Sequence, residues 1–394
     1  MFIKMLSKVQ SSQHWLSQFL PEHRSIAAQL LDSLHIVSSE DMRSDLRVLI
    51  EDIAWDRLQK AALLPIRECT AQESIYDTQN PTISPVLQSA TESLGSEAFI
   101  SNLYTELTRA RKRQFMLEKV RVNGEDKELA PSLSFMKQHK FKNLFLVDDL
   151  IGSGDRVVSY LDALFRNKTI NSWVSYGYIK VHIVSFMATD EGKRIVSRAI
   201  KRRKNVSLHV MHRAPSISDL ADSKALESLC KSYADKKTQY PLGYKESAVR
   251  VVFTHSAPNN LPSILYRPIY KKFRPNNAPS INLSKWDPMF PNRTIPQQFK
   301  QDLAAIKRKP SSRVDILHLL ELLKNGANKR EDIAHLMNRA SAYIQTLLDL
   351  CERMGFLTQN RAIIGITNQG LCELSRPASA NYTIEKNEEF YYPH

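Results

Sequence analysis

The sequence has few cysteines, and they are not clustered. Among 394 residues there are only four, at Cys69, Cys230, Cys351 and Cys372. They lie far apart with no C-x-x-C spacing, which argues against a zinc site or a disulfide framework and fits a reducing compartment. Metal spacing is also missing from the histidines His209, His212 and His255. We expect these histidines in the core or at the surface, unless they lie near Asp148.

Long apolar segments are missing as well. No stretch approaches the roughly 20 apolar residues that a membrane-spanning helix needs. The first six residues, Met1 to Leu6, form too short an apolar run for a signal peptide. We therefore expect a cytoplasmic protein with no membrane partner.

Negative charge is in deficit. Lysine and arginine number 55 against 41 aspartate and glutamate residues, which gives a net charge of +14. Such a surface favours a polyanionic partner such as nucleic acid, although a basic protein also gains solubility from its charge. The length allows two or three domains at roughly 100–200 residues each.

The most informative stretch runs from residue 144 to residue 158. Four apolar residues, 144–147, predict a strand buried on both faces. Asp148 and Asp149 follow at its expected exposed end, and the turn Gly152-Ser153-Gly154 leads into an apolar-periodic helix. The order is strand, acidic pair, small loop and helix.

Each part of this stretch suits a sugar phosphate. Adjacent carboxylates such as Asp148 and Asp149 accept hydrogen bonds from the two vicinal hydroxyls of a ribose. Gly152 and Gly154 let the backbone approach a ligand closely, while the Ser153 hydroxyl and the amides of the next helix face a phosphate. A second interpretation is a buried strand whose two aspartates only cap the following helix.

The segment from Val147 to Gly154 resembles the signature of the phosphoribosyltransferase superfamily, position by position. The chain departs from that signature at Asp155 and Arg156, where the family usually has threonine or serine. A carboxylate aimed into the loop would repel a phosphate, unless Arg156 offsets it or Asp155 points away as an acid at the helix start.

The resemblance implies roles for these residues. Asp148 and Asp149 would be catalytic, holding the ribose, with Mg²⁺ as a possible cofactor, while a cationic centre at C1 is stabilised electrostatically. The implied ligand-binding set is Asp148, Asp149, Gly152, Ser153, Gly154 and Arg156. In the family, the loop after the first strand contacts pyrophosphate, and residues 91–96 occupy the equivalent place in chain order. The usual Arg or Lys and paired glycines are missing here, so an ordinary strand-to-helix turn is the alternative.

Alternating strand and helix patterns predict an α/β fold with a parallel sheet. We expect a helical extension over residues 1–80, with helices from Trp15 to about Arg67, and a phosphoribosyltransferase-like domain over 81–300. Expected elements of that domain are a strand from residue 85, a helix at 97–113, a hairpin at Asn123-Gly124, and strands at 178–186, 206–211 and 249–253.

A pair of loops and a basic run in this domain each allow two interpretations. The loops 254–260 and 286–290 carry aromatic and amide groups; either they form a hood over the sugar site, or Trp286 and Phe290 pin a long loop to the body. The basic run 201–204 is either a solvated turn or a contact to phosphates.

The last part of the chain resembles a winged helix-turn-helix domain over residues 311–376, followed by a tail at 377–394. Three short helices precede two strands that form the wing. If the domain binds DNA, the third helix enters the major groove. A protein-binding module is the alternative, because Asp349 and Glu352 lie on that third helix. The expected nucleic-acid contacts are Lys329, Arg330, Arg339, Ser341, Tyr343, Gln345 and Arg361.

The order of the two domains resembles effector proteins of bacterial anti-phage systems, in particular those encoded beside retron reverse transcriptases. The resemblance implies a toxin held inactive by a reverse transcriptase and its DNA–RNA product, acting on a nucleotide, NAD or another phosphoribosyl compound. Two alternatives stay open: a ligand-sensing, DNA-binding regulator with a degenerate site, and a silent adaptor that binds nucleic acid.

Overall fold

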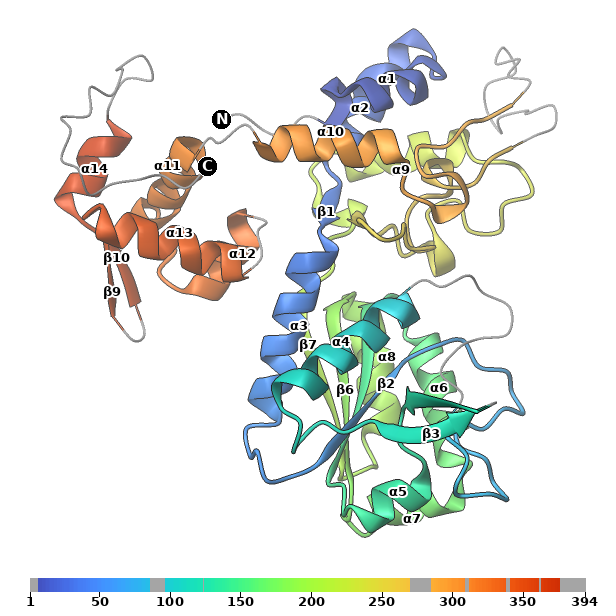
Figure 1. Ribbon diagram of the computed structural model, residues 1–394. Helices are drawn as coiled ribbons and strands as arrows, with labels where there is room; N and C mark the ends of the chain where they lie inside the picture. Colours follow the sequence, from blue (N-terminus) through green and yellow to red (C-terminus); the bar gives the residue numbers. More distant parts are fainter. Residues whose placement is uncertain are drawn as a thin grey trace. The chain divides into compact units, whose positions relative to one another are not determined.

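The computed structural model (Figure 1) describes residues 6–85, 96–122, 124–269, 285–308, 312–337, 341–360 and 363–375. The chain forms two compact units, one within residues 2–308 and one within residues 309–394. Each unit has its own hydrophobic core and is described by itself.

A four-stranded parallel sheet forms the centre of the larger unit, in the order β2-β5-β6-β7. The strands are β2 (Ala61–Pro65), β5 (Asn143–Ile151), β6 (Lys180–Ala188) and β7 (Val206–Arg213). All nine residues of β5 are buried, because helices cover both faces of the sheet (Figure 1). The predicted α/β fold is confirmed.

Six helices pack around this sheet. Two of them, α6 and α8, connect successive parallel strands and pack on each other, as right-handed crossovers require. The six are α3 (Ser39–Ile53), α4 (Ser96–Ala110), α5 (Leu133–Gln138), α6 (Asp155–Phe165), α7 (Lys168–Ser175) and α8 (Asp190–Ile200). The predicted hairpin is also present as β3 (Glu118–Val122) and β4 (Glu125–Leu129).

The helical prediction for residues 15–67 is wrong in two places. Residues His35–Val37 form β1, which pairs in parallel with β8 (Val251–Phe253), and Ala61–Pro65 form β2, an edge strand of the main sheet. β2 is apolar throughout and buried throughout, and periodicity does not separate such a strand from a buried helix. Of the strand expected from residue 85, positions 86 and 87 lie outside the described residues.

A second hydrophobic cluster belongs to the same unit. It gathers four helices, α1 (Gln10–Ser17), α2 (Arg24–Asp32), α9 (Ser223–Ser232) and α10 (Gln297–Arg308). Trp286 and Phe290 are fully enclosed in it, and the Trp286 indole donates a hydrogen bond to the Ile264 carbonyl at 2.9 Å. These two aromatic residues therefore pin their loop to the body, which decides between the two interpretations of residues 286–290.

Six short 3₁₀ helices complete the connections of this unit: η1 (Leu6–Lys8), η2 (Pro21–His23), η3 (Ile217–Asp219), η4 (Tyr244–Glu246), η5 (Ser263–Leu265) and η6 (Pro291–Arg293). No helix among the described residues combines the length and apolar character needed to cross a bilayer.

The smaller unit is the predicted winged helix. Its helices enclose a core that includes Leu319, Leu320 and Leu348, and the two wing strands pair in an antiparallel way. The elements are α11 (Ser312–Lys324), α12 (Arg330–Met337), α13 (Ser341–Arg353), β9 (Leu357–Asn360), β10 (Ile363–Ile366) and α14 (Asn368–Leu374).

Candidate active site

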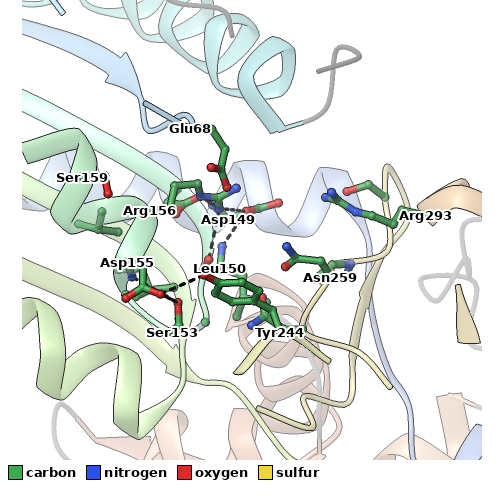
Figure 2. Close-up of a pocket in the computed structure, with 18 of the residues that line it drawn as sticks. Glu68, Asp149, Leu150, Ser153, Asp155, Arg156, Ser159, Tyr244, Asn259 and Arg293 are labelled. Carbon is green, nitrogen blue, oxygen red and sulfur yellow. Dashed lines mark hydrogen bonds and ion pairs between the residues drawn. The ribbon is translucent and has the colours of Figure 1, made fainter. Parts of the chain in front are cut away.

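A cavity of about 600 Å³ lies at the carboxyl end of β5 (Figure 2). One wall consists of the acidic pair, the glycine loop 152–154 and the start of α6. The opposite wall comes from the loops around Tyr244, residues 255–260 and residues 292–294. All six residues of the predicted ligand-binding set line this cavity.

The acidic pair lies inside the strand rather than beyond its end. β5 continues to Ile151, since β6 is equally long and pairs with it through Asp148 opposite Ser185 and Leu150 opposite Met187. Asp148 is 1% exposed and Asp149 6% exposed. The expectation of an exposed acidic tip is therefore wrong, because the longer ladder carries both carboxylates into the protein.

Arg156 closes over both carboxylates. Its Nη2 atom lies 2.6 Å from Oδ1 of Asp148 and 3.5 Å from Oδ1 of Asp149, and it also donates to the Leu150 carbonyl at 3.4 Å. The second oxygen of Asp148, Oδ2, is buried and has no hydrogen-bond partner among the described residues. Among the described residues, it is the one oxygen of the pair that has no hydrogen bond.

The pKa values of the two carboxyls move in opposite directions. Burial, together with the negative charge of the neighbouring Asp149, raises the pKa of Asp148 to about 8 against the opposing charge of Arg156. Burial also acts to raise the pKa of Asp149, but the hydrogen bond with His255 and the charge of Arg156 outweigh it and lower that pKa. At neutral pH the pair therefore holds one proton, on Asp148.

His255 is held against Asp149 from the opposite wall. Its Nε2 atom lies 3.3 Å from Oδ2 of Asp149, and its Nδ1 atom lies 3.2 Å from the hydroxyl of Ser39. The ring is stacked between Phe99 and Phe253, with centroids 5.6 and 5.3 Å away. The histidine therefore belongs to the site, the condition under which we expected a role for it.

The glycine loop is fixed by close packing. Gly154 has a left-handed φ of +84°, and a Cβ atom on Gly152 would lie 2.2 Å from Nδ2 of Asn260. The Thr189 hydroxyl, which caps α8, donates to the Gly152 carbonyl at 2.6 Å. A Cβ atom on Gly192 would lie 2.2 Å from that same carbonyl, so the first turn of α8 is part of the loop's support.

Asp155 accepts a hydrogen bond from the Ser153 hydroxyl, which we expected to face a phosphate. Its Oδ2 atom accepts hydrogen bonds from Ser153 at 3.0 Å and from Tyr244 at 3.3 Å, and it pairs with Nζ of Lys245 at 2.6 Å. Burial opposes the charge of Asp155, but Lys245 and Ser153 keep its pKa below the usual value. The cation that offsets Asp155 is thus Lys245, whereas the expected one, Arg156, binds the acidic pair.

Several lining residues were not found from the sequence. Glu68 and Cys69 follow β2 and line the cavity, so the described loop after the first strand of the sheet is residues 66–70; the loop expected at 91–96 lies, except for Ser96, outside the described residues. An apolar strand followed by polar residues is the signal that marks it. Figure 2 shows Glu68 on one side of Arg156, and Asn259 and Arg293 across from Asp149.

The opposite wall concentrates unusual backbone conformations. Five of the six described non-glycine residues with positive φ lie in its two loops, at Lys245, Glu246, Ala248, Asn292 and Arg293. Side chains other than glycine reach this conformation at a cost in free energy, and such strain gathers at functional sites. The loop 254–260 contributes His255, Asn259 and Asn260 to the same wall, as the hood interpretation of that loop predicts.

The residues expected to contact nucleic acid lie in the winged helix. Lys329 and Arg330 are exposed, and Tyr343 donates a hydrogen bond to Asp315 at 2.5 Å. Gln345 accepts from Arg330 at 3.1 Å and donates to Asp349 at 2.7 Å. Arg339, Arg361 and the side chain of Ser341 lie outside the described residues. The role of these residues stays a prediction.

Two family models match the sequence. The PRTase-CE model matches residues 12–292, which is more than half of the chain, and the model described as wHTH-PRTase associated matches residues 317–394. Curated proteins include no match. A solved structure of the AQ2163 protein from Aquifex aeolicus is 11% identical and covers 50% of this chain and 85% of its own, with a TM-score of 0.25.

Proposed function

Because the chain belongs to the PRTase-CE family, we propose that its cavity binds the phosphoribosyl part of a nucleotide and acts on the bond at C1 of the ribose. The observation that carries this proposal is the pair of adjacent buried carboxylates, Asp148 and Asp149, with opposed pKa shifts at one cavity. Two carboxyls in different protonation states divide acid and electrostatic roles between them.

The two carboxyls have complementary tasks. Ionised Asp149, oriented by His255, accepts hydrogen bonds from the ribose hydroxyls and stabilises positive charge as the bond at C1 breaks. Protonated Asp148 donates its proton to the leaving group, which departs with the bonding electron pair. Water or another acceptor then bonds to C1 and releases a proton if it is water. The products are a ribose phosphate derivative and a free base or other leaving group.

The phosphate of the ligand fits the glycine loop. The start of α6 offers backbone amides and the positive end of a helix dipole of 11 residues. Lys245 and the Ser153 hydroxyl reach the same place, where Asp155 now bonds both of them. A bound phosphate replaces the Asp155 carboxylate as their partner.

The expected Mg²⁺ stays a proposal. Such an ion is usually held by one or two carboxylates together with phosphates of the substrate, and Asp148 and Asp149 would be its carboxylates here. Arg156 already supplies a positive charge at 2.6 Å from Asp148, and the mechanism above assigns no step to a metal.

We also propose that the protein is an effector of a retron-type anti-phage system, held by a reverse transcriptase and its DNA–RNA product. What supports this is the domain order, a phosphoribosyltransferase-like unit followed by a winged helix, which resembles such effectors. The damaging reaction would then be the loss of a nucleotide or NAD pool.

A second candidate is a ligand-sensing regulator of DNA binding. The observation that favours it is that groups expected to bind the ligand already have partners within the protein. Arg156 bonds Asp148, and the Ser153 hydroxyl donates to Asp155. In this case the sugar phosphate binds without chemistry and changes the DNA affinity of the winged helix.

Metabolite profiling separates the two candidates. Cells express the wild-type chain, Asp149→Asn, or Asp162→Asn as a matched control, because Asp162 is exposed on α6 outside the cavity lining. We expect a nucleotide, NAD or phosphoribosyl diphosphate pool to fall with wild type and the control but not with Asp149→Asn. Unchanged pools with soluble wild-type protein would reject the enzyme and favour the regulator.

A further inference from the structure

The amino edge of the main sheet carries a row of lysines, at the end of the strands opposite the acidic pair. The Lys142 amide donates a hydrogen bond to the Lys60 carbonyl at 2.9 Å, and the Lys180 amide donates to the Lys142 carbonyl at 2.9 Å. Neighbouring strands lie about 4.8 Å apart, so these three lysines stand side by side where β2, β5 and β6 begin.

More cations extend this row. The turn 201–204 comes just before β7, and the Val181 amide bonds the Asn205 carbonyl at 2.8 Å, which places the turn beside the start of β6. Next to β5, the end of α5 adds Lys137 and Lys140. Several of these exposed cations form no ion pair within the described part of the chain. They are Lys137, Lys140, Lys142, Lys180, Lys201, Arg202 and Lys204.

One of these lysines is held in an unfavourable backbone conformation. Lys140 has a φ of +57° directly after α5, and the Phe141 amide bonds back to the Met136 carbonyl at 3.0 Å, which is the usual end of a helix that stops at glycine. Glycine fits this position with less strain. The lysine therefore costs stability, which is consistent with a use for its charge.

Exposed aromatic side chains lie among the cations. Trp55 is 78% exposed, Tyr176 76% and Tyr178 60%, and the two tyrosine rings are 6.2 Å apart. The tyrosines lie between Lys180 and the basic turn, since the Asn205 side chain bonds the Val174 carbonyl at 2.7 Å. Trp55 lies in the loop that ends at Lys60.

We propose that this amino-edge surface, formed by Trp55, Lys60, Lys137, Lys140, Lys142, Tyr176, Tyr178, Lys180 and residues 201–204, binds single-stranded nucleic acid. Cations that lack carboxylate partners are matched to phosphates, and exposed flat rings are matched to unpaired bases, which a duplex does not present. Along β5, Lys142 and Asp148 are about 20 Å apart, so a bound strand leaves the cavity open. All residues of this surface belong to the larger unit.

The first test is charge reversal measured by fluorescence anisotropy. The full chain is titrated against a labelled oligothymidylate of about 20 nucleotides. We expect Lys142→Glu with Lys180→Glu to weaken binding at least tenfold and to reduce the slope of log K against log salt by about 1.4, or about 0.7 for each lost phosphate contact. The matched control, Lys224→Glu with Lys236→Glu, changes the net charge equally on exposed positions near α9 and should bind like wild type.

The second test separates stacking from charge. Tyr176→Ala with Tyr178→Ala should weaken binding of the single strand about tenfold and leave the weaker binding of a duplex of the same length unchanged. Equal affinity of wild type and the lysine variant would overturn the proposal, as would equal loss in the lysine variant and its control. Loss of single-strand binding in Arg330→Glu alone would assign the contact to the winged helix instead.

Discussion

Replacement of Asp148 by asparagine should make the larger unit more stable at neutral and mildly alkaline pH. Asp148 has a pKa of about 8 in the folded protein, against about 3.9 for an unfolded aspartate. Between these two values the folded chain holds a proton that the unfolded chain has released. The proton bound to Asp148 therefore contributes stability in full below the pKa of the unfolded chain, and that stability is lost as the pH rises towards the pKa of the folded chain.

The size of the effect follows from one proton. Asp148 alone should lower the free energy of unfolding of the wild type by about 1.4 kcal/mol per pH unit in this window, or by about 2.7 kcal/mol from about pH 5 to about pH 7. Asparagine at position 148 removes that slope. Arg156 keeps a carboxylate partner in the variant, since its Nη2 atom is also 3.5 Å from Asp149.

Urea unfolding followed by tryptophan fluorescence measures this difference. All four tryptophans, Trp15, Trp55, Trp173 and Trp286, lie in the larger unit, so the signal reports on that unit alone. The free energy of unfolding of Asp148→Asn minus that of the wild type should rise by this amount as the pH increases. The lowered pKa of His182 acts in the opposite direction, but it is common to both proteins and cancels in the difference. Parallel curves for the two proteins between about pH 5 and about pH 8 would refute the assignment of the proton to Asp148.

Three further changes test other contacts of the site. His255→Ala removes a hydrogen bond that lowers the pKa of Asp149, so activity should fall about tenfold and the acid limb of its pH profile should move to higher pH. Gly152→Ala should destabilise the unit by about 1–3 kcal/mol in urea unfolding, and adding Asn260→Ala should recover most of that loss; no recovery would contradict the clash. Lys245→Met should weaken binding of a ribose phosphate about tenfold in calorimetry without affecting binding of the unphosphorylated ribose.

The elements with strong local signals were predictable from the sequence. The apolar run before Asp148, the glycine loop after it and the hairpin at Gly124 each follow from residue types within a few positions. The winged helix was found in the same way, because its helices are short and clearly bounded. β2 was missed since its residues are apolar at every position, which carries no strand period.

The opposite wall of the cavity was harder to predict from the sequence. Asp149 and His255 are 106 positions apart in the sequence, and the histidine follows β8, which pairs with β1 in a separate two-stranded sheet. The positive φ angles of Lys245 and Arg293 are invisible in a sequence, because neither residue type favours them. Sequence therefore identified the wall made by one continuous segment. In the opposite wall it offered loop 254–260 as one of two interpretations, and it missed Tyr244 and residues 292–294.

The contacts of Asp155 suggest how the site distinguishes ligands. The Asp155–Lys245 pair is well exposed, with side chains 37% and 46% accessible, so breaking it costs little, of the order of 0–1 kcal/mol. A phosphate dianion recovers that cost, because it carries more charge than the carboxylate and accepts bonds from Lys245, Ser153 and the amides of α6 together. A ribose without a phosphate has nothing to exchange for the pair. The departure from the family signature at Asp155 is thus compatible with the proposed phosphate binding, and we expect phosphorylated ligands to bind more tightly than free nucleosides.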